Sequence, residues 1–147
     1  MTSRAQLFFV LSTGNGTYTL SNLDISPFEA LHYSRKTNFA GWAILIVYEN
    51  PALPLNQLNI YDGLQGVPDA LQIDLTNLYV LNNANAKAGF IAWEGDSQLP
   101  TETFTVNGTV ISNPFNPPNN VFNSTNSVTG SNQLYNMDLD IYDIDSY

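Results

Sequence analysis

The sequence has no cysteine, one histidine and only four basic side chains among its 147 residues. Without cysteine there is no disulfide framework, no thiol nucleophile and no thiolate metal site. The 13 acidic residues outnumber the basic ones and leave a formal net charge of −9. Nucleic acids and anionic membranes both attract basic surfaces, so we expect neither a nucleic-acid partner nor binding to an anionic membrane surface.

Long hydrophobic runs are also missing. The longest apolar stretch covers residues 43–48, whereas a membrane-spanning helix needs about 20 apolar residues, so we expect no direct membrane insertion. The opening residues MTSR lack the features of a signal peptide, and an export signal would therefore lie outside this sequence. An alternating pattern runs up to Tyr147 without a closing turn, so we expect the domain to continue and this sequence to be an excerpt of a longer protein.

Turn-forming residues are abundant instead. Asparagine, glycine and proline interrupt the chain at short intervals and supply left-handed or fixed-φ positions. Short β-branched and aromatic runs lie between them, and long stripes of helical period are absent. This pattern predicts a single all-β module over residues 1–147, an antiparallel β-sandwich of jelly-roll type with about eight or nine strands.

The strongest strand predictions are the segments that are apolar on both faces, residues 39–48 and 88–94. We expect Trp42 and Trp93 within them to lie in the core. The Asn107-Gly108 turn predicts a hairpin within residues 102–111. Further strands are predicted at residues 17–25, 57–62, 70–81 and 134–144.

Two segments do not follow the strand pattern. Residues 27–35 favour a short helix, with Pro27 in its first turn and Ser26 as its cap. Residues 112–133 contain several Pro, Asn and Ser residues, and we interpret them as a long surface connection with at most one short strand, near Val121 and Phe122.

Five segments are distinctive in combination: GNGTYTLSNLDISPFEA (14–30), FAGWAILIVYENPALPLNQLNIYDGLQGV (39–67), GFIAWEGD (89–96), NPFNPPNNVFNSTNS (113–127) and LYNMDLDIYD (134–143). In this order they resemble an ectodomain module of the large SprB-type surface adhesins of gliding Bacteroidota. The resemblance implies type IX secretion, display at the cell surface on the extracellular side of the outer membrane, and a role in attachment and gliding. The implied partners are neighbouring modules of the same polypeptide, surface polysaccharide or another substratum, and the gliding and secretion machinery. It implies no site residues.

Catalysis has little support in the sequence. His32 is the only histidine, and no Gly-x-Ser-x-Gly elbow supports a triad with Ser34. A glycosidase needs two carboxylates across the sugar, and Glu49, Glu94 and Asp96 lie near aromatic residues, but strand ends commonly have this composition. We therefore expect the chain not to be an enzyme.

Metal binding is the better-supported chemistry. Asp138 and Asp140 point to one side of a predicted strand and could share a calcium ion, which takes about six to eight oxygen ligands. Asp143 and Asp145 follow closely, but Asp143 falls on the opposite side and the spacing is not that of an EF-hand. The more ordinary interpretation is a solvated strand face whose charges deter pairing between sheet edges.

Carbohydrate binding is the alternative to an adhesive role. Sugars stack on exposed aromatic rings, and we consider six candidates for such a platform. These are Trp42, Trp93, Tyr33, Tyr48, Tyr61 and Tyr79.

Overall fold

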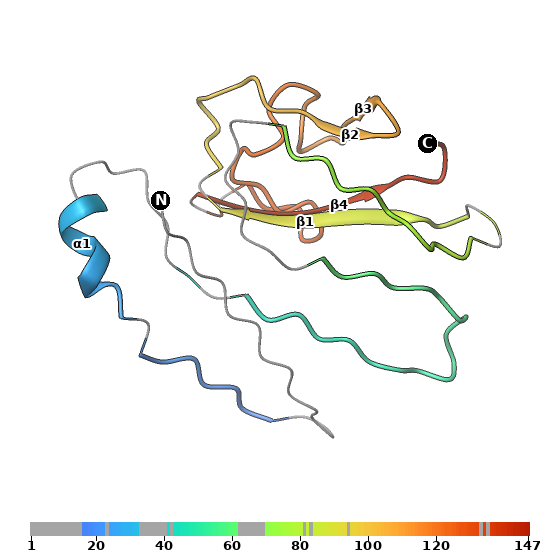
Figure 1. The fold of residues 1–147 in the computed structure, drawn as a ribbon, viewed down its shortest axis with the longest axis horizontal. Helices are drawn as coiled ribbons and strands as arrows, with labels where there is room; N and C mark the ends of the chain where they lie inside the picture. The colour runs from blue at the N-terminus through green and yellow to red at the C-terminus, as the bar shows by residue number, and fades with distance from the viewer. Residues whose placement is uncertain are drawn as a thin grey trace. The chain divides into compact units, whose positions relative to one another are not determined.

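The computed structural model describes residues 16–22, 24–32, 41, 43–61, 70–80, 82, 84–93, 95–132, 134 and 136–147. The chain divides into two compact units. The first comprises Met1–Ser21 and Ile44–Leu81, and the second comprises Asn22–Ala43 and Asn82–Tyr147. All helices and strands of the described residues belong to the second unit (Figure 1).

Two small antiparallel sheets make up the regular part of the second unit. β1 (Lys87–Trp93) and β4 (Met137–Asp143) lie side by side and pair along their whole length (Figure 1). β2 (Phe104–Val106) and β3 (Thr109–Ile111) form a hairpin. The fold is thus mainly β, and the strands predicted at residues 88–94 and 134–144 are confirmed.

The β2–β3 hairpin is confirmed together with its turn. Asn107 and Gly108 have φ angles of 49° and 79°. A two-residue turn with positive φ at both positions matches the twist of the strands that it joins. The Asn-Gly pair is therefore a local signal that fixes the register of this hairpin, with Val106 opposite Thr109.

The hydrophobic core of the second unit lies between these two sheets. Its most buried members are Ile111, Val121 and Tyr142, and the partly buried residues packed against them are Phe90, Phe104, Val106, Phe122 and Ile144. The Phe90 ring of β1 packs edge-to-face on Phe104 of β2 with ring centroids 5.3 Å apart. Aromatic rings thus hold the hairpin against the β1–β4 pair.

The segment between β3 and β4 contributes to this core, so the predicted surface connection at residues 112–133 is wrong for its buried residues, whereas residues 117–119 and 128–130 are exposed as expected. Asn116, Val121 and Thr125 are buried. The segment is also anchored through its backbone, because the Asp96 N–H donates to the Phe122 carbonyl at 2.7 Å. The many asparagines suggested a solvated loop. An asparagine amide can both donate and accept hydrogen bonds. In this segment such side-chain hydrogen bonds take the place of the backbone hydrogen bonds of a sheet.

The first unit departs most from the predicted sandwich. Its described residues, 16–21, 44–61 and 70–80, contain no hydrogen-bonded strand. The described parts of the segments predicted as strands at residues 17–25, 39–48, 57–62 and 70–81 are therefore not in strands. The apolar run from Ile44 to Tyr48 is exposed. An apolar run becomes a central strand only when neighbouring backbones supply a ladder. In this unit a side chain supplies the cross-link: Gln57 Oε1 accepts from the Tyr79 N–H at 2.6 Å.

The short helix α1 (Ser26–His32) confirms the helix predicted at residues 27–35, although residues 33–35 lie outside the described part of the chain. Its cap differs from the prediction. Oδ1 of Asp24 accepts from the Ser26 N–H at 3.0 Å and from the Ser26 hydroxyl at 2.5 Å. These hydrogen bonds lower the pKa of Asp24 below its usual value. No described helix has the length and apolarity to cross a bilayer.

Candidate functional site

The inward face of β4 carries two carboxylates. Along this strand Asp138, Asp140 and Tyr142 alternate with apolar residues, so they share one face. Asp138 and Asp140 are both 0% exposed, whereas the apolar Ile141 on the other face is 44% exposed. The interpretation of Asp138 and Asp140 as a solvated strand face is therefore wrong, because the acids point into the protein.

Asp138 anchors the middle of the preceding loop. Its Oδ1 accepts hydrogen bonds from the backbone N–H groups of Asn123 at 2.9 Å and Thr125 at 3.0 Å. Its Oδ2 is buried with no hydrogen-bond partner and lies against Gly95. Burial disfavours the charged form and raises the pKa of Asp138 to about 6, although the N–H donors act in the opposite direction.

Asp140 anchors two other points of the same loop. Its Oδ2 accepts from the Asn116 side-chain amide at 2.7 Å, and its Oδ1 accepts from the Ser127 N–H at 3.0 Å. Asn116 is itself fully buried, and its amide also donates to the Val121 carbonyl and accepts from the Thr125 hydroxyl. Burial raises the pKa of Asp140 as well.

We call Asn116, Asp138 and Asp140 the aspartate clamp. Three of its four carboxylate oxygens accept hydrogen bonds from residues 116–127. A buried carboxylate is retained only when such donors replace its hydration. Chemically the clamp therefore fixes a loop that has little regular secondary structure, and it turns its carboxylates towards that loop.

The neighbouring Tyr142 hydroxyl is buried and has no hydrogen-bond partner. Burial and the charges of Asp140 and Asp138 raise its pKa. Tyr142 therefore stays protonated at neutral pH. Its ring contributes to the core, where it lies 5.2 Å from the ring of Phe104.

The structure brings the predicted metal ligands Asp138 and Asp140 together on one face of β4, as the alternation implies. Asp143 lies on the opposite, exposed face and forms an ion pair with Lys87 of β1. The described residues contain no group of three or more His, Cys, Asp or Glu side chains that could hold a metal ion. Calcium binding by Asp138 and Asp140 stays a prediction.

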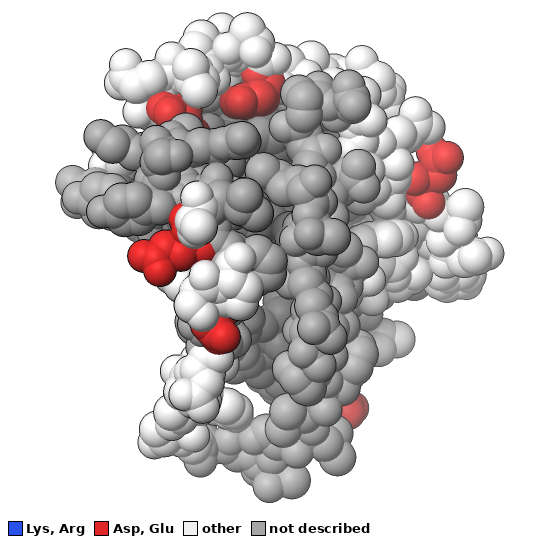
Figure 2. All heavy atoms as spheres, turned by 60° about the vertical axis from the view of Figure 1, so that its left-hand side comes forward, with Lys and Arg blue, Asp and Glu red and all other residues white. Residues whose placement is uncertain are grey.

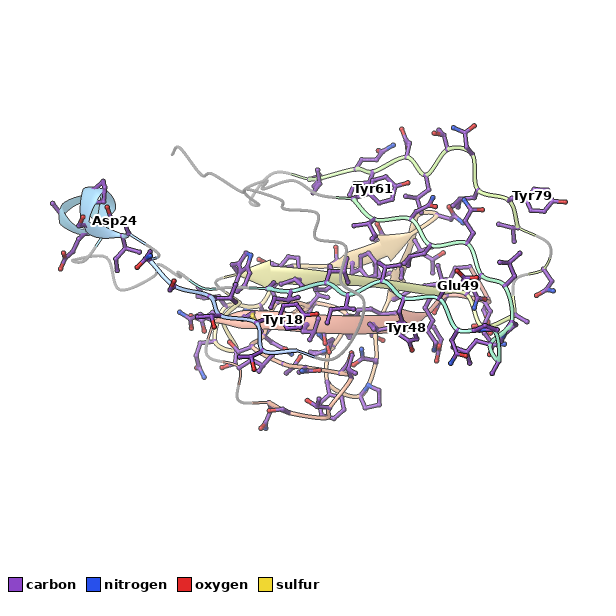
Figure 3. All side chains as sticks on the ribbon, turned by 90° about the horizontal axis from the view of Figure 1, so that it is seen from below. Tyr18, Asp24, Tyr48, Glu49, Tyr61 and Tyr79 are labelled. Atoms are coloured by element: carbon purple, nitrogen blue, oxygen red, sulfur yellow. The ribbon has the colours of Figure 1, made fainter. Side chains whose placement is uncertain are left out.

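The other predicted site residues differ in their exposure to solvent. Trp93 is half-buried at the end of β1. Tyr48, Tyr61 and Tyr79 are 72%, 52% and 77% exposed, and Figure 3 shows Tyr79 pointing away from the chain. Glu49 and Asp96 are exposed. The other candidates lie outside the described side chains: His32, Tyr33, Ser34, Trp42 and Glu94.

Sequence reasoning missed Asn116, which belongs to the clamp, and Gly95, which lies against it. Asn116 is 24 positions from Asp140, and Gly95 is far from both aspartates in the sequence. No local spacing links such positions. The only available signal was the density of asparagines before β4, which also suits a solvated loop.

Acidic side chains are spread over the surface at separate places in the face that Figure 2 shows. Lys87 is the only lysine or arginine among the described residues.

No family model matches the chain, and no similar curated protein or solved structure is found.

Proposed function

We propose that this chain is a non-catalytic extracellular module of a large cell-surface adhesin that takes part in attachment and gliding motility. The aspartate clamp supports the non-catalytic part of this proposal, and the resemblance of the five sequence segments to SprB-type modules supports the adhesin part. Catalytic carboxylates must reach a substrate, whereas Asp138 and Asp140 are fully buried and hold the loop of residues 116–127. The paired acids of this chain thus serve its architecture.

The sandwich is part of the same proposal. The β1–β4 pair and the β2–β3 hairpin are two layers of an antiparallel β-sandwich, completed by further strands. The edge-to-face contacts of Phe90 with Phe104 and Phe122, each at 5.3 Å, support two layers with an aromatic interior. The aspartate clamp ties the loop of residues 116–127 to β4 and so helps to hold the module together without disulfides.

In this proposal the module is exported by type IX secretion and displayed on the extracellular side of the outer membrane. Its partners are neighbouring modules of the same polypeptide, surface polysaccharide or another substratum, and the gliding machinery. The net charge of −9 and the scarcity of lysine and arginine support an outward-facing surface, because like charge keeps exposed modules from associating unspecifically.

A bead-attachment assay tests this function. Inert beads coated with the chain are placed on agarose, on extracellular polysaccharide and on glass, and flow is applied. Beads with the intact chain should stay attached several-fold more often than beads with the Asn116→Asp variant, whose clamp is broken. Equal detachment on every surface contradicts the adhesive role, and release of reducing sugar from the polysaccharide contradicts the non-catalytic one.

The open reading frame that encodes the chain offers an independent check. An adhesin module should stand among sibling modules in a polypeptide that carries a type IX sorting domain. A reading frame that lacks both would contradict the adhesin proposal while leaving the module's binding properties open to direct assay.

Carbohydrate binding is the second candidate, and the exposed tyrosines of the first unit favour it. Tyr48 and Tyr79 present most of their surface to solvent, as sugar-stacking rings do. Affinity electrophoresis in polysaccharide gels should show retardation that Tyr48→Ala and Tyr79→Ala reduce and that Tyr147→Ala, a control at another exposed tyrosine, leaves unchanged. Unretarded migration in every gel would remove this candidate.

A further inference from the structure

A second group of polar atoms lies where Glu102 and Asn120 form an isolated parallel bridge. Glu102 Oε2 and Asn120 Oδ1 are both buried, and neither has a hydrogen-bond donor. Asn120 as a whole is only 9% exposed. A buried oxygen without a partner costs about 1–3 kcal/mol. Two such oxygens on bridged residues leave acceptor capacity that a bound water or a cation can fill.

The Asn120 side chain reaches the turn that follows β1, and Glu102 interacts with the charge of Asp96 in the same turn. The Asn120 amide donates through Nδ2 to the Ser97 carbonyl at 3.2 Å, which places its Oδ1 beside this turn. The Phe122 backbone lowers the pKa of Glu102, whereas the nearby charge of Asp96 raises it. The Phe122 carbonyl in turn accepts from the Asp96 N–H at 2.7 Å. One peptide segment thus holds Glu102 and Asp96 near each other.

The charges at this place are unbalanced. Desolvation and the charge of Asp96 raise the pKa of Glu102. Lys87, the only described lysine or arginine, is already paired with Asp143 on the exposed face of β4. Water could satisfy the two open acceptors, but it would leave two neighbouring carboxylates without a counter-charge.

We propose that Glu102, Asn120 and Asp96 bind a divalent cation, calcium in particular. Each residue contributes a side-chain oxygen, and water completes the coordination shell. Carboxylate and amide oxygens are the ligands that calcium prefers. The site is distinct from the Asp138 and Asp140 pair, whose oxygens mostly accept hydrogen bonds from the protein. It does not rest on the adhesin proposal.

Three protein ligands define a weak site. Extracellular calcium modules commonly bind in the range of about 0.1 to 1 mM. Calcium should outcompete magnesium here, because magnesium requires near-octahedral geometry and gives up its water reluctantly. Bound calcium would tie the turn after β1 to the bridge at residue 120 and so stiffen the start of the loop that the aspartate clamp holds further on.

Calorimetric titration and thermal unfolding of the whole chain test the site. The chain is first dialysed against EDTA and then titrated with calcium chloride at about pH 7.5, where carboxylates are ionised. We expect heat of binding at millimolar calcium and a rise in the unfolding midpoint of about 2–5 °C at saturation. Magnesium should give a smaller rise.

Glu102→Gln is the most informative variant. Its amide keeps an acceptor oxygen for the Phe122 backbone, and its NH2 group can donate to Asn120 Oδ1. In EDTA this variant should therefore unfold at a higher temperature than the wild type, while its response to calcium disappears. Asp96→Asn keeps the acceptor for the Gln98 N–H and should weaken calcium binding about tenfold. Asp74→Asn, at an exposed acid of the first unit, is the matched control and should respond like the wild type.

Each other result overturns the proposal. A wild type that ignores calcium up to about 20 mM, well above the range of weak extracellular sites, has no such site. If calcium stabilises the wild type and both the Glu102→Gln and Asp96→Asn variants equally, the chain binds calcium at another place. If Glu102→Gln is stabilised in EDTA but the wild type does not respond, the two oxygens are satisfied by water and no cation is bound.

Discussion

Gly95 lies directly against the carboxylate of Asp138. A Cβ built on Gly95 would overlap Oδ2 of Asp138 and come within 2.9 Å of its carboxyl carbon and 3.0 Å of the Phe122 carbonyl carbon. Real side chains do not tolerate such distances, and the displaced group is a buried carboxylate that anchors a loop. Glycine is therefore needed at position 95 for close approach of the backbone to the clamp.

Gly95→Ala should consequently destabilise the chain by about 3 kcal/mol, because overpacking moves Asp138 away from the N–H groups of Asn123 and Thr125. Urea unfolding measures the loss. Gly16→Ala is the matched control, since a Cβ there meets nothing within 4 Å. A similar midpoint for the Gly95 and Gly16 variants would show that the clamp does not depend on this contact.

Protonation of Asp138 should contribute to the pH dependence of stability. Its folded pKa is about 6, above the unfolded value of about 3.9. The folded state then binds more protons between these values, so stability is full below about pH 4 and falls as the pH rises through about 6. The pKa of Asp140 is raised too and acts in the same direction. The urea midpoint should therefore be higher at pH 4.5 than at pH 7.5.

Asp138→Asn separates this effect from the general relief of charge repulsion in acid. The amide oxygen can still accept from Asn123 and Thr125, but it does not titrate. The variant should show a flatter profile between about pH 4 and pH 7 than the wild type. Identical slopes would assign the pH dependence to the net charge of −9 and to other groups.

Asn116 should be the least replaceable residue of the clamp. Asn116→Asp removes the donor that Asp140 accepts at 2.7 Å and places a second carboxylate in the same buried site. We expect a loss of about 3–5 kcal/mol at pH 7.5, part of which returns at pH 4.5 when one carboxylate is protonated. Chemical unfolding at the two pH values measures both effects.

The exposed Asn119 supplies the control for this charge change. Asn119→Asp adds the same charge to the same loop at the surface and should change stability by less than about 0.5 kcal/mol. If both substitutions cost the same, the damage comes from net charge and the buried hydrogen bonds contribute little.

The sequence predicted those elements whose signals are local. The Asn107-Gly108 turn specifies its hairpin through backbone preference alone, and the alternation of residues 137–143 specifies a strand. Which face of that strand points into the protein could not be predicted in the same way. Acids ordinarily face solvent, and only the partners supplied by Asn116, Asn123 and Thr125 reverse the rule for Asp138 and Asp140.

The apolar run at residues 44–48 shows the opposite error, because it was expected to be buried and is exposed. Its composition predicts a central strand, but a strand needs neighbours for its backbone, and the described residues of the first unit form no ladder with it. Local composition therefore identified apolar segments correctly as candidates and could not decide which of them are covered. The calcium prediction at Asp138 and Asp140 also followed from residue types alone, and it stays a prediction.

The aromatic core between the sheets gives the last prediction. Phe90 touches Phe104 and Phe122 edge-to-face at 5.3 Å and lies 6.0 Å from the ring of Tyr142. Phe90→Ala should cost about 2–4 kcal/mol, because it leaves a cavity between β1 and the hairpin and removes the ring contacts at once.

Ile91→Ala provides the control within the same strand. Ile91 is exposed and lies on the opposite face of β1, so its truncation should cost less than about 1 kcal/mol. Urea midpoints and near-ultraviolet circular dichroism follow the two variants, since the second signal reports the packing of the rings. Equal losses would mean that the two sheets do not share a core and that the hairpin packs on β1 without contributing to stability. A large loss for Phe90→Ala alone, with a weakened aromatic signal, supports the two-layer arrangement on which the proposed sandwich depends.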